Sequence, residues 1–262
     1  MFPFHLPNLD PVALSIGPLE IRWYSLAYIC GILFTVFWLS KNNKDKLLSK
    51  EALDDWLTWA VISILFGGRF GYVFFYNWPY YSQNLGEIFA FWKGGMSFHG
   101  GLLGAILGMW LFAKKYKIDY LKLTDRLCVA APIGLFFGRI ANFINMELYG
   151  RATNSDYGII FPGAGDFPRH PSQLYEAFCE GLLLFAILFL LQKHKISKHR
   201  GFLSGVFLVG YTFFRMIIEN FREPDQQIGL FFEKITLGQI LSTPLFMLGI
   251  FLLLRPVSKK NS

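Results

Sequence analysis

Seven apolar stretches, each long enough to cross a lipid bilayer, constrain the fold of this 262-residue chain more than any other feature. A hydrocarbon core about 30 Å thick needs roughly 20 apolar residues in a helix, because a helix rises about 1.5 Å per residue. Inside lipid every backbone polar group needs an internal hydrogen bond, which a helix supplies. We therefore predict an all-α integral membrane protein. Its spans are expected near residues 21–40, 53–76, 96–113, 125–145, 172–192, 203–221 and 237–254.

The overall composition agrees with a membrane protein and excludes a soluble one. Hydrophobic residues make up 53% of the chain and charged residues only 16%, too few to cover a soluble domain. The net charge of +7 would suit a nucleic-acid-binding protein, but the basic residues lie in short loops between apolar stretches. No repeat, low-complexity tract or separate polar region divides the sequence, so we expect one transmembrane domain over residues 1–262.

The distribution of lysine and arginine among the loops predicts how the helices are oriented. Basic residues crowd alternate loops and the end of the chain, at residues 41–50, 114–122, 193–200 and 255–260. The other loops carry only Lys93, Arg151, Arg169, Arg222 and Lys234. Because the basic side of such proteins faces the cytoplasm, we expect the N-terminus outside and the C-terminus in the cytoplasm. The long loops 77–95 and 146–171 are then external and are expected to form a small cap.

Three arginines lie inside predicted spans where no helix end explains them. Arg69, Arg139 and Arg215 each precede the outer end of an outward-running helix by about six or seven residues, which places them roughly 10 Å below the outer interface. Ionisable residues in a span are costly and usually functional. The inward-running helices carry polar groups at a similar depth, namely Tyr24, Tyr28, His99, Gln173, Tyr175 and Glu176. The cytoplasmic halves of the spans, by contrast, are almost wholly apolar.

One polar stripe follows the sixth predicted span. Tyr211, Arg215 and Glu219 recur at intervals of four residues and therefore share one helical face. Arg215 and Glu219 could form a structural ion pair, since partners four residues apart reach each other. Such a pair would not exclude a role for either residue in a functional site.

A second polar group lies at the outer end of the fourth predicted span. Arg139 and Asn142 share a face of this helix, and Asn145 and Glu147 lie just beyond its end. Arginines at one depth repel one another unless an anion joins them, and the natural anion at this depth is a lipid phosphate. Arg69 has an alternative interpretation, because a long side chain near a helix end can snorkel to the outer headgroups.

The third predicted span combines a glycine stripe with a single histidine. Gly100, Gly104 and Gly108 recur every four residues, a spacing that lets a neighbouring helix backbone approach closely. We expect this stripe to serve packing. A lone histidine in a span, such as His99, ordinarily makes a helix–helix hydrogen bond.

The segment GRIANFINMELYGR, from Gly138 to Arg151, closely resembles the signature of bacterial phosphatidylglycerol–prolipoprotein diacylglyceryl transferases. Ala141 replaces the glycine of many members and retains a small residue. The resemblance continues in order along nearly the whole chain. Its further segments are IRWYSLAY (21–28), GGRFGYVFFY (67–76), GGMSFHGGLLG (94–104), HPSQLYEAF (170–178) and GYTFFRMIIENFREPD (210–225).

The resemblance implies a seven-helix enzyme of the bacterial cytoplasmic membrane. Such an enzyme transfers the diacylglyceryl group of phosphatidylglycerol to the lipobox cysteine of a prolipoprotein, forming a thioether and releasing glycerol phosphate. This is the first step of bacterial lipoprotein maturation. By motif, the resemblance also implies functional roles for Tyr24, His99, Arg139, Asn142, Glu147, Gly150, Tyr211, Arg215 and Glu219.

The chemistry of this transfer assigns expected roles to the polar residues. Arg139 and Arg215 are expected to bind the phosphate as its negative charge grows. His99 is expected either to remove the thiol proton or only to position the headgroup, while the field of the arginines lowers the pKa of the thiol. We expect the other polar positions to bind substrate: Tyr24, Arg69, Asn142, Asn145, Glu147, Gly150, Tyr211 and Glu219.

Two other classes of membrane protein fit the sequence less well. An anion transporter needs polar groups along a whole path and often carries internal repeats, neither of which the sequence shows. A magnesium-dependent phospholipid-synthesising transferase would carry clustered carboxylates near the cytoplasm. We therefore expect no metal and no cofactor, and a site that faces the outer leaflet.

Overall fold

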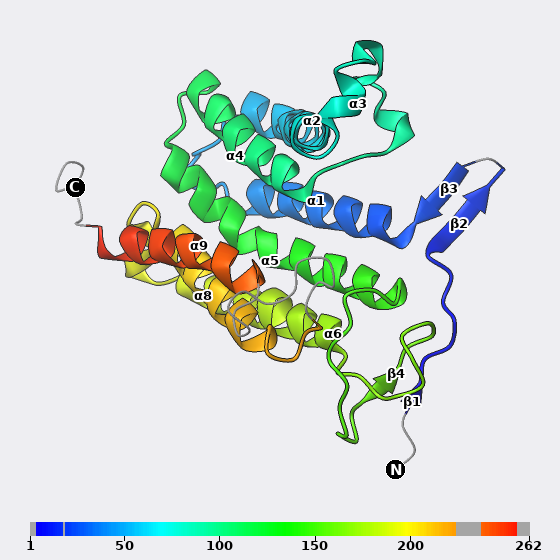
Figure 1. Cartoon of the computed structure of the whole chain (residues 1–262). Helices are drawn as coiled ribbons and strands as arrows, with labels where there is room; N and C mark the ends of the chain where they lie inside the picture. Colours follow the sequence, from blue (N-terminus) through cyan, green and yellow to red (C-terminus); the bar gives the residue numbers. More distant parts are fainter. Residues whose placement is uncertain (1–3, 18, 224–236, 256–262) are drawn as a thin grey trace. The chain divides into compact units, whose positions relative to one another are not determined.

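The computed structural model describes residues 4–17, 19–223 and 237–255 and groups the chain into two compact units (Figure 1). The split unit combines Met1–Phe37 with Thr124–Ser262, and the inserted unit comprises Trp38–Leu123. A single domain stays a prediction. Three basic residues used to predict the orientation lie outside the described residues: Lys234, Lys259 and Lys260.

Each predicted span corresponds to a helix, with bounds confirmed to within a few residues. The fifth is a composite, in which a π-helical stretch, η3, separates two α-helical pieces. The helices are α1 (Trp23–Lys41), α2 (Lys50–Phe75), α4 (Phe98–Lys115), α5 (Tyr120–Ile144), α6 (Ser172–Glu176), η3 (Ala177–Leu183), α7 (Leu184–Leu191), α8 (Phe202–Ile218) and α9 (Leu237–Leu254).

Within the described part of the chain, four helices are long and apolar enough to cross a membrane. They are Trp23–Lys41, Lys50–Phe75, Tyr120–Ile144 and Ser172–Leu191. Phe202–Ile218 and Gly238–Leu254 are shorter apolar helices. The protein is therefore a multi-pass membrane protein by helix length and composition, and the full set of seven spans stays a prediction.

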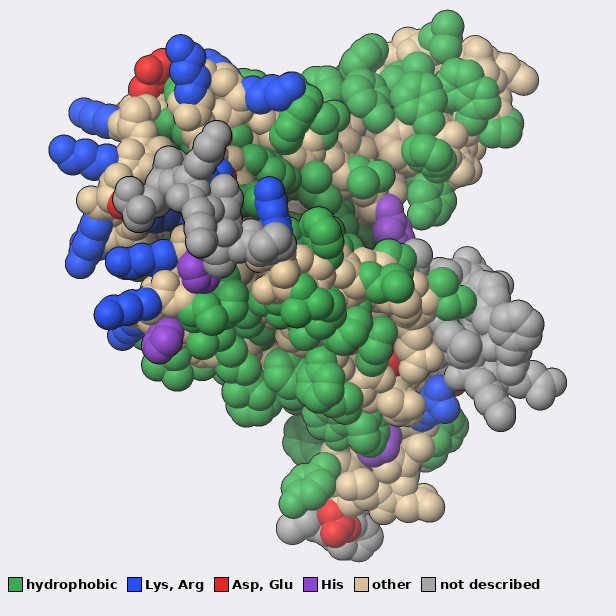
Figure 2. Space-filling model, turned by 90° about the vertical axis from the view of Figure 1, so that its left-hand side faces the viewer, with side chains coloured by type: hydrophobic (Ala, Val, Ile, Leu, Met, Phe, Trp, Pro, Cys, Tyr) green, Lys and Arg blue, Asp and Glu red, His purple; other side chains and the backbone are tan. Residues whose placement is uncertain are grey.

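The surface of the helices has the character that lipid contact requires. Large hydrophobic side chains are widely exposed, including Leu103 at 64%, Phe213 at 54% and Met247 at 68%. Figure 2 shows hydrophobic side chains over much of the visible face. In water such a surface would drive association, whereas lipid tails cover it without cost.

In the inserted unit, α2 and α4 pack through glycines. A Cβ added at Gly100 would lie 2.8 Å from the Cα of Gly71, and one at Gly104 would lie 2.8 Å from the Cα of Gly67. Side chains there would separate the two backbones, so the packing role predicted for the glycine stripe is confirmed. The serine before each helix caps it: the Oγ of Ser49 accepts from the backbone N–H of Ala52, and that of Ser97 from Gly100.

The basic ends of this helix pair lie together. Lys50 is the first residue of α2. Lys114 and Lys115 lie in the last turn of α4, where the helix dipole favours positive charge. The Nζ of Lys115 lies 3.1 Å from the Oδ2 of Asp55, which joins the start of one helix to the end of the other. Between α2 and α4 the chain forms three short helices, α3 (Trp78–Tyr81), η1 (Leu85–Glu87) and η2 (Phe91–Lys93).

In the split unit, a buried carboxylate fixes the start of α8. The Oδ2 of Asp125 accepts the backbone N–H of Gly201 at 2.7 Å, and its Oδ1 accepts that of Ser204 at 2.8 Å. These bonds satisfy N–H groups that the first turn of a helix leaves without a partner. Helix α9 then packs along α8, where a Cβ on Gly205 would lie 3.0 Å from the carbonyl oxygen of Gly249.

Short strands, which the sequence did not predict, form outside the spans. β1 (Phe4–His5) pairs in parallel with β4 (Ile159–Ile160), and β2 (Val12–Ile16) pairs in antiparallel fashion with β3 (Leu19–Arg22). Since β3 extends to Arg22, α1 begins at Trp23 rather than near residue 21. Leu6, Phe161 and Ala164 form a small hydrophobic cluster beside β1 and β4.

Candidate functional site

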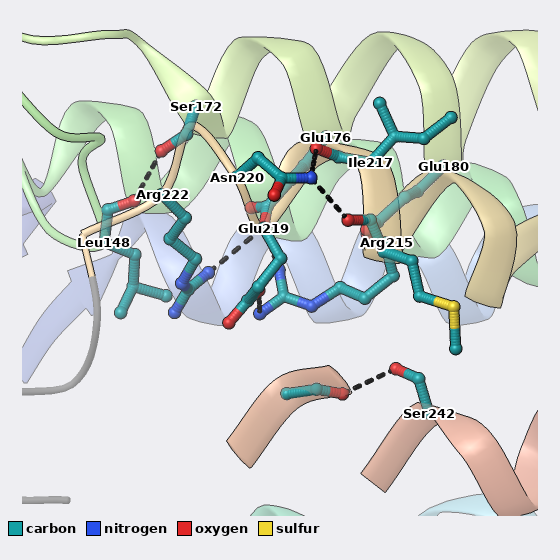
Figure 3. A network of polar contacts seen from close by, with 12 residues as sticks. Leu148, Ser172, Glu176, Glu180, Arg215, Ile217, Glu219, Asn220, Arg222 and Ser242 are labelled. Carbon is teal, nitrogen blue, oxygen red and sulfur yellow. Dashed lines mark hydrogen bonds and ion pairs between the residues drawn. The ribbon is translucent and has the colours of Figure 1, made fainter. Parts of the chain in front are cut away.

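A fully buried carboxylate in the split unit joins three arginines, and Figure 3 shows it with two of them, Arg215 and Arg222. Glu176 is the last residue of α6. Its Oε2 lies 3.2 Å from the Nε of Arg139 on α5, and its Oε1 lies 3.1 Å from the Nη1 of Arg222. The Nη1 of Arg215 on α8 donates to the same Oε1. One carboxylate therefore gathers guanidinium groups from both α5 and α8.

Two further carboxylates complete the cluster. The Oε2 of Glu180 lies 3.2 Å from the Nη2 of Arg139, and the Oε2 of Glu219 lies 2.7 Å from the Nη2 of Arg215. The ion pair predicted between Arg215 and Glu219 is confirmed. Buried charges are tolerated only when paired, and removing one partner of a buried pair typically costs about 3–5 kcal/mol. The carboxylates and guanidinium groups of this cluster therefore depend on one another.

This cluster changes one step of the reasoning from sequence. A lipid phosphate was expected to offset the repulsion between arginines at one depth. The protein also supplies anions of its own, Glu176 and Glu180. Sequence reasoning gave no site role to Glu176, Glu180 or Arg222. Two glutamates four residues apart within an apolar span were the signal for the first two, because that spacing puts both on one helical face.

A second polar group joins α1 to the C-terminal end of α5. The Nδ2 of Asn142 donates to the hydroxyl of Tyr24 and, at 2.9 Å, to the Oε1 of Glu147. The structure therefore brings together three residues predicted for the site. Asn145 follows the end of α5, and among the described residues its buried Oδ1 accepts no hydrogen bond.

The turn after α5 is held tightly against the start of α6. The Nε2 of Gln173 donates to the carbonyl of Glu147 at 2.7 Å, and the Oγ of Ser172 donates to that of Leu148 at 3.0 Å. Met146 and Leu148 have φ angles of 55° and 56°, which non-glycine residues rarely adopt. Such strain persists where the surrounding contacts impose it, often at functional sites.

Gly150 lies where two segments leave no room for a side chain. Its N–H donates to the carbonyl of His170 at 2.8 Å. A Cβ would lie 2.6 Å from that oxygen and 2.5 Å from the carbonyl oxygen of Phe221. The contact holds the segment that carries Arg222, with which Gly150 forms a β-bridge. Close packing thus accounts for this glycine, and substrate contact there stays a prediction.

Tyr211 lies one turn before Arg215 on α8. Its ring stacks on that of Phe207, with the ring centres 6.1 Å apart. A role for Tyr211 in binding substrate stays a prediction.

Arg69 lies in the inserted unit, fully buried on α2. Its Nε donates to the carbonyl of Ile88 and its Nη2 to that of Glu87, both at 2.8 Å, while its Nη1 donates to the carbonyls of Gly94 and Gly95. The side chain therefore holds the segment between α2 and α4 through backbone carbonyls. Complete burial does not fit snorkelling to headgroups, and contact of Arg69 with substrate stays a prediction.

His99 also belongs to the inserted unit. It is the second residue of α4, it is exposed, and its ring lies edge-on to that of Phe98 with centres 5.7 Å apart. Exposure leaves the ring nitrogens accessible to a bound molecule. Neither of the two roles predicted for His99 is decided by these contacts.

The arrangement in the split unit can bind an anion and stabilise growing negative charge. Arg139, Arg215 and Arg222 retain 15%, 12% and 10% side-chain exposure, so none of these side chains is completely enclosed. Guanidinium groups held rigidly in a partly dry site stabilise charge more strongly than in water. Among the described residues, no group of three or more histidine, cysteine, aspartate or glutamate side chains has the arrangement of a metal site.

Comparison with known proteins agrees with this arrangement. The sequence profile of the prolipoprotein diacylglyceryl transferase family matches residues 11–255. A phosphatidylglycerol–prolipoprotein diacylglyceryl transferase of Rickettsia typhi is 52% identical over 257 residues, which cover 97% of this chain and 99% of the relative. The enzyme of the same name from Rickettsia felis is 53% identical over 250 residues, which cover 94% of this chain and 96% of the relative.

Proposed function

This chain belongs to the prolipoprotein diacylglyceryl transferase family, and from that premise we propose how its residues carry out the reaction. The protein is a membrane-bound transferase of lipoprotein biosynthesis. It transfers the diacylglyceryl group of phosphatidylglycerol to a prolipoprotein.

The acceptor in this proposal is the thiol of the lipobox cysteine in the signal peptide of the prolipoprotein. The sulfur attacks the glyceryl CH2 that bears the phosphate ester, a C–S bond forms and the C–O bond to phosphate breaks. The products are a thioether and glycerol phosphate, and the thiol proton leaves the sulfur. The reaction therefore needs a thiolate and a group that stabilises the departing phosphate. A free cysteine has a pKa of about 8.5, so its thiol is mostly protonated at neutral pH.

The observation that carries the proposal is the arginine cluster around Glu176. Arg139 and Arg215 come from different helices, and each is held by two carboxylates. In this proposal their guanidinium groups donate hydrogen bonds to the phosphate of phosphatidylglycerol. Because the arginines are already oriented, they stabilise the charge that grows on the phosphate without having to reorganise.

The neighbouring polar residues orient the substrate in this proposal. Tyr24, Asn142 and Glu147 form a connected group whose hydroxyl and carboxylate suit the hydroxyls of the glycerol headgroup. Glu219 orients Arg215. The further substrate-binding positions are Arg69, Asn145, Gly150 and Tyr211.

His99 retains two roles in the proposal. As a general base it takes the thiol proton, a task suited to a histidine because its ordinary pKa is about 6.5. Alternatively it positions the headgroup, and the positive field of Arg139 and Arg215 favours the thiolate. The pH dependence of a His99 variant separates these roles.

The proposal also places the enzyme in the bacterial cytoplasmic membrane, with seven spans, the N-terminus outside and the site toward the outer leaflet. The support comes from the basic ends of the helices and the widely exposed hydrophobic side chains. The signal peptide of a prolipoprotein reaches that leaflet, since its mature part is exported.

The direct test combines purified protein with phosphatidylglycerol and a lipobox peptide. We expect release of glycerol phosphate, with an equimolar gain of one diacylglyceryl group by the peptide, detected by mass. A peptide with serine in place of the cysteine and a lipid with an ethanolamine headgroup serve as controls. Equal transfer to the serine peptide would contradict the thiol as acceptor. Absence of transfer from phosphatidylglycerol by folded protein would contradict the function.

A further inference from the structure

A π-helical stretch interrupts the helix that carries Glu176. Ser172–Glu176 is α-helical, Ala177–Leu183 is π-helical, and the chain returns to an α-helix at Leu184. A π-helix is wider than an α-helix and rare, and it occurs frequently at functional sites. This one directly follows the carboxylate that joins the arginines.

The stretch is pressed against α5 close to Arg139. A Cβ added at Gly181 would lie 2.7 Å from the Cβ of Phe136 and 3.0 Å from its Cα. Only glycine permits that approach, and Phe136 lies one helical turn before Arg139, on the same side of α5. The neighbouring Glu180 is fully buried, and its Oε2 lies 3.2 Å from the Nη2 of Arg139.

Glu180 and Glu176 contact different nitrogens of Arg139. Glu176 lies against the Nε and Glu180 against the Nη2, so the planar guanidinium is fixed at two points. A single contact would leave the group free to turn about that contact, whereas two contacts set its plane. Among the described residues no acceptor is recorded at the Nη1 of Arg139, which carries two N–H donors.

Burial of Glu180 is otherwise hard to explain. The other carboxylate oxygen, Oε1, is buried and has no hydrogen-bond partner within the described part of the chain. A carboxylate in a membrane helix is costly, and packing alone would be served better by an apolar residue. Its ion pair with Arg139 is the contact that offsets this cost.

We infer that Glu180, brought against Arg139 by the π-helical stretch, is a positioning residue that aims the Nη1 edge of Arg139 at the substrate phosphate. The inference rests on the proposed function. Glu180 acts through Arg139, so it should affect the rate of transfer only when residue 139 carries a guanidinium group.

A double-mutant cycle tests this coupling by single-turnover rates at saturating phosphatidylglycerol, with enzyme in excess over lipobox peptide. Glu180→Gln retains the size of the side chain and an acceptor oxygen but loses the charge. In the otherwise natural chain we expect the rate to fall by about 10- to 100-fold, the scale on which small misplacements act. In an Arg139→Lys background, where there is no guanidinium to aim, the same change should cost less than about twofold.

The matched control is Asp125→Asn, which likewise converts a buried carboxylate to an amide. Asp125 lies on α5, and its carboxylate accepts backbone N–H groups at the start of α8. Any loss of rate from this change should be the same in both backgrounds, because these hydrogen bonds do not involve Arg139. Thermal unfolding of every variant in detergent shows whether the fold is retained.

Equal losses from Glu180→Gln in both backgrounds would overturn the inference while leaving the proposed function intact. Should Glu180→Gln fail to fold, Glu180→Leu gives the same cycle without an isolated polar group. If the natural chain itself transfers no diacylglyceryl group, the proposed function fails instead. The two failures are therefore distinguishable.

Discussion

At the scale of single residues, the main finding is that Glu176 gives three arginines an anionic partner from the protein itself. Its two oxygens contact Arg139, Arg215 and Arg222. These contacts orient the arginines within the protein itself, and oriented charges stabilise a growing negative charge strongly. Their positions inside the spans follow from the sequence, but their common partner depends on how three helices pack.

The role of His99 is tested by the pH dependence of His99→Gln. If His99 takes the thiol proton, activity should be lost at neutral pH and partly regained as pH rises, because free thiolate becomes abundant above the thiol's ordinary pKa of about 8.5. The measurement is the single-turnover rate from about pH 7 to about pH 9.5 with a lipobox peptide. A defect that stays constant over this range would exclude the base and favour positioning of the headgroup.

At the scale of elements, glycine contacts set the spacing of helices in the inserted unit. Sequence periodicity predicted the stripe on α4 but gave no partner for it. The partner surface on α2 contains Gly67 and Gly71, which lie within the same GGRFGY segment as Arg69. Arg69 in turn holds the segment of α3, η1 and η2, so helix packing and the placement of that segment depend on adjacent residues of one helix.

Gly100→Ala tests the packing of α2 on α4. The added Cβ would lie 2.8 Å from the Cα of Gly71, and backbone cannot move aside as a side chain can. We expect the free energy of unfolding to fall by about 1–3 kcal/mol, the usual cost of overpacking. Gly86→Ala, in the same unit and with nothing within 4 Å of the added Cβ, is the control. Equal thermal stability of the two variants in detergent would contradict the close approach.

At the scale of the whole molecule, sequence predicted the helices well and the connections poorly. Hydropathy is a local property, so all seven helices appear where apolar stretches occur, and α9 matches its predicted bounds of 237–254. The strands β1 and β4 pair residues far apart in sequence, Phe4 with Ile159, and no local pattern indicates such a contact. Glu176 and Glu180 carried a local signal in their spacing, but their pairing with Arg139 joins segments far apart in sequence and was missed for the same reason.

The predicted orientation in the membrane is tested by cysteine labelling in intact cells. With Cys30, Cys128 and Cys179 replaced by alanine, Ser155→Cys should react with an impermeant thiol reagent, because its loop carries few basic residues. Ser197→Cys, beside Lys195 and Lys198, should react only after the cells are opened. Labelling of Ser197→Cys in sealed cells would reverse the orientation and move the site to the cytoplasmic leaflet.

The most direct test of how the arginine cluster works is the rate of diacylglyceryl transfer by Arg139→Lys, measured beside Arg139→Ala. Lysine keeps the charge but cannot contact two acceptors with a planar group. We expect Arg139→Ala to lose nearly all turnover while the protein stays folded in the membrane, and Arg139→Lys to recover little of it. Near-natural turnover by Arg139→Lys would show that charge alone suffices, and it would contradict an oriented guanidinium at the phosphate.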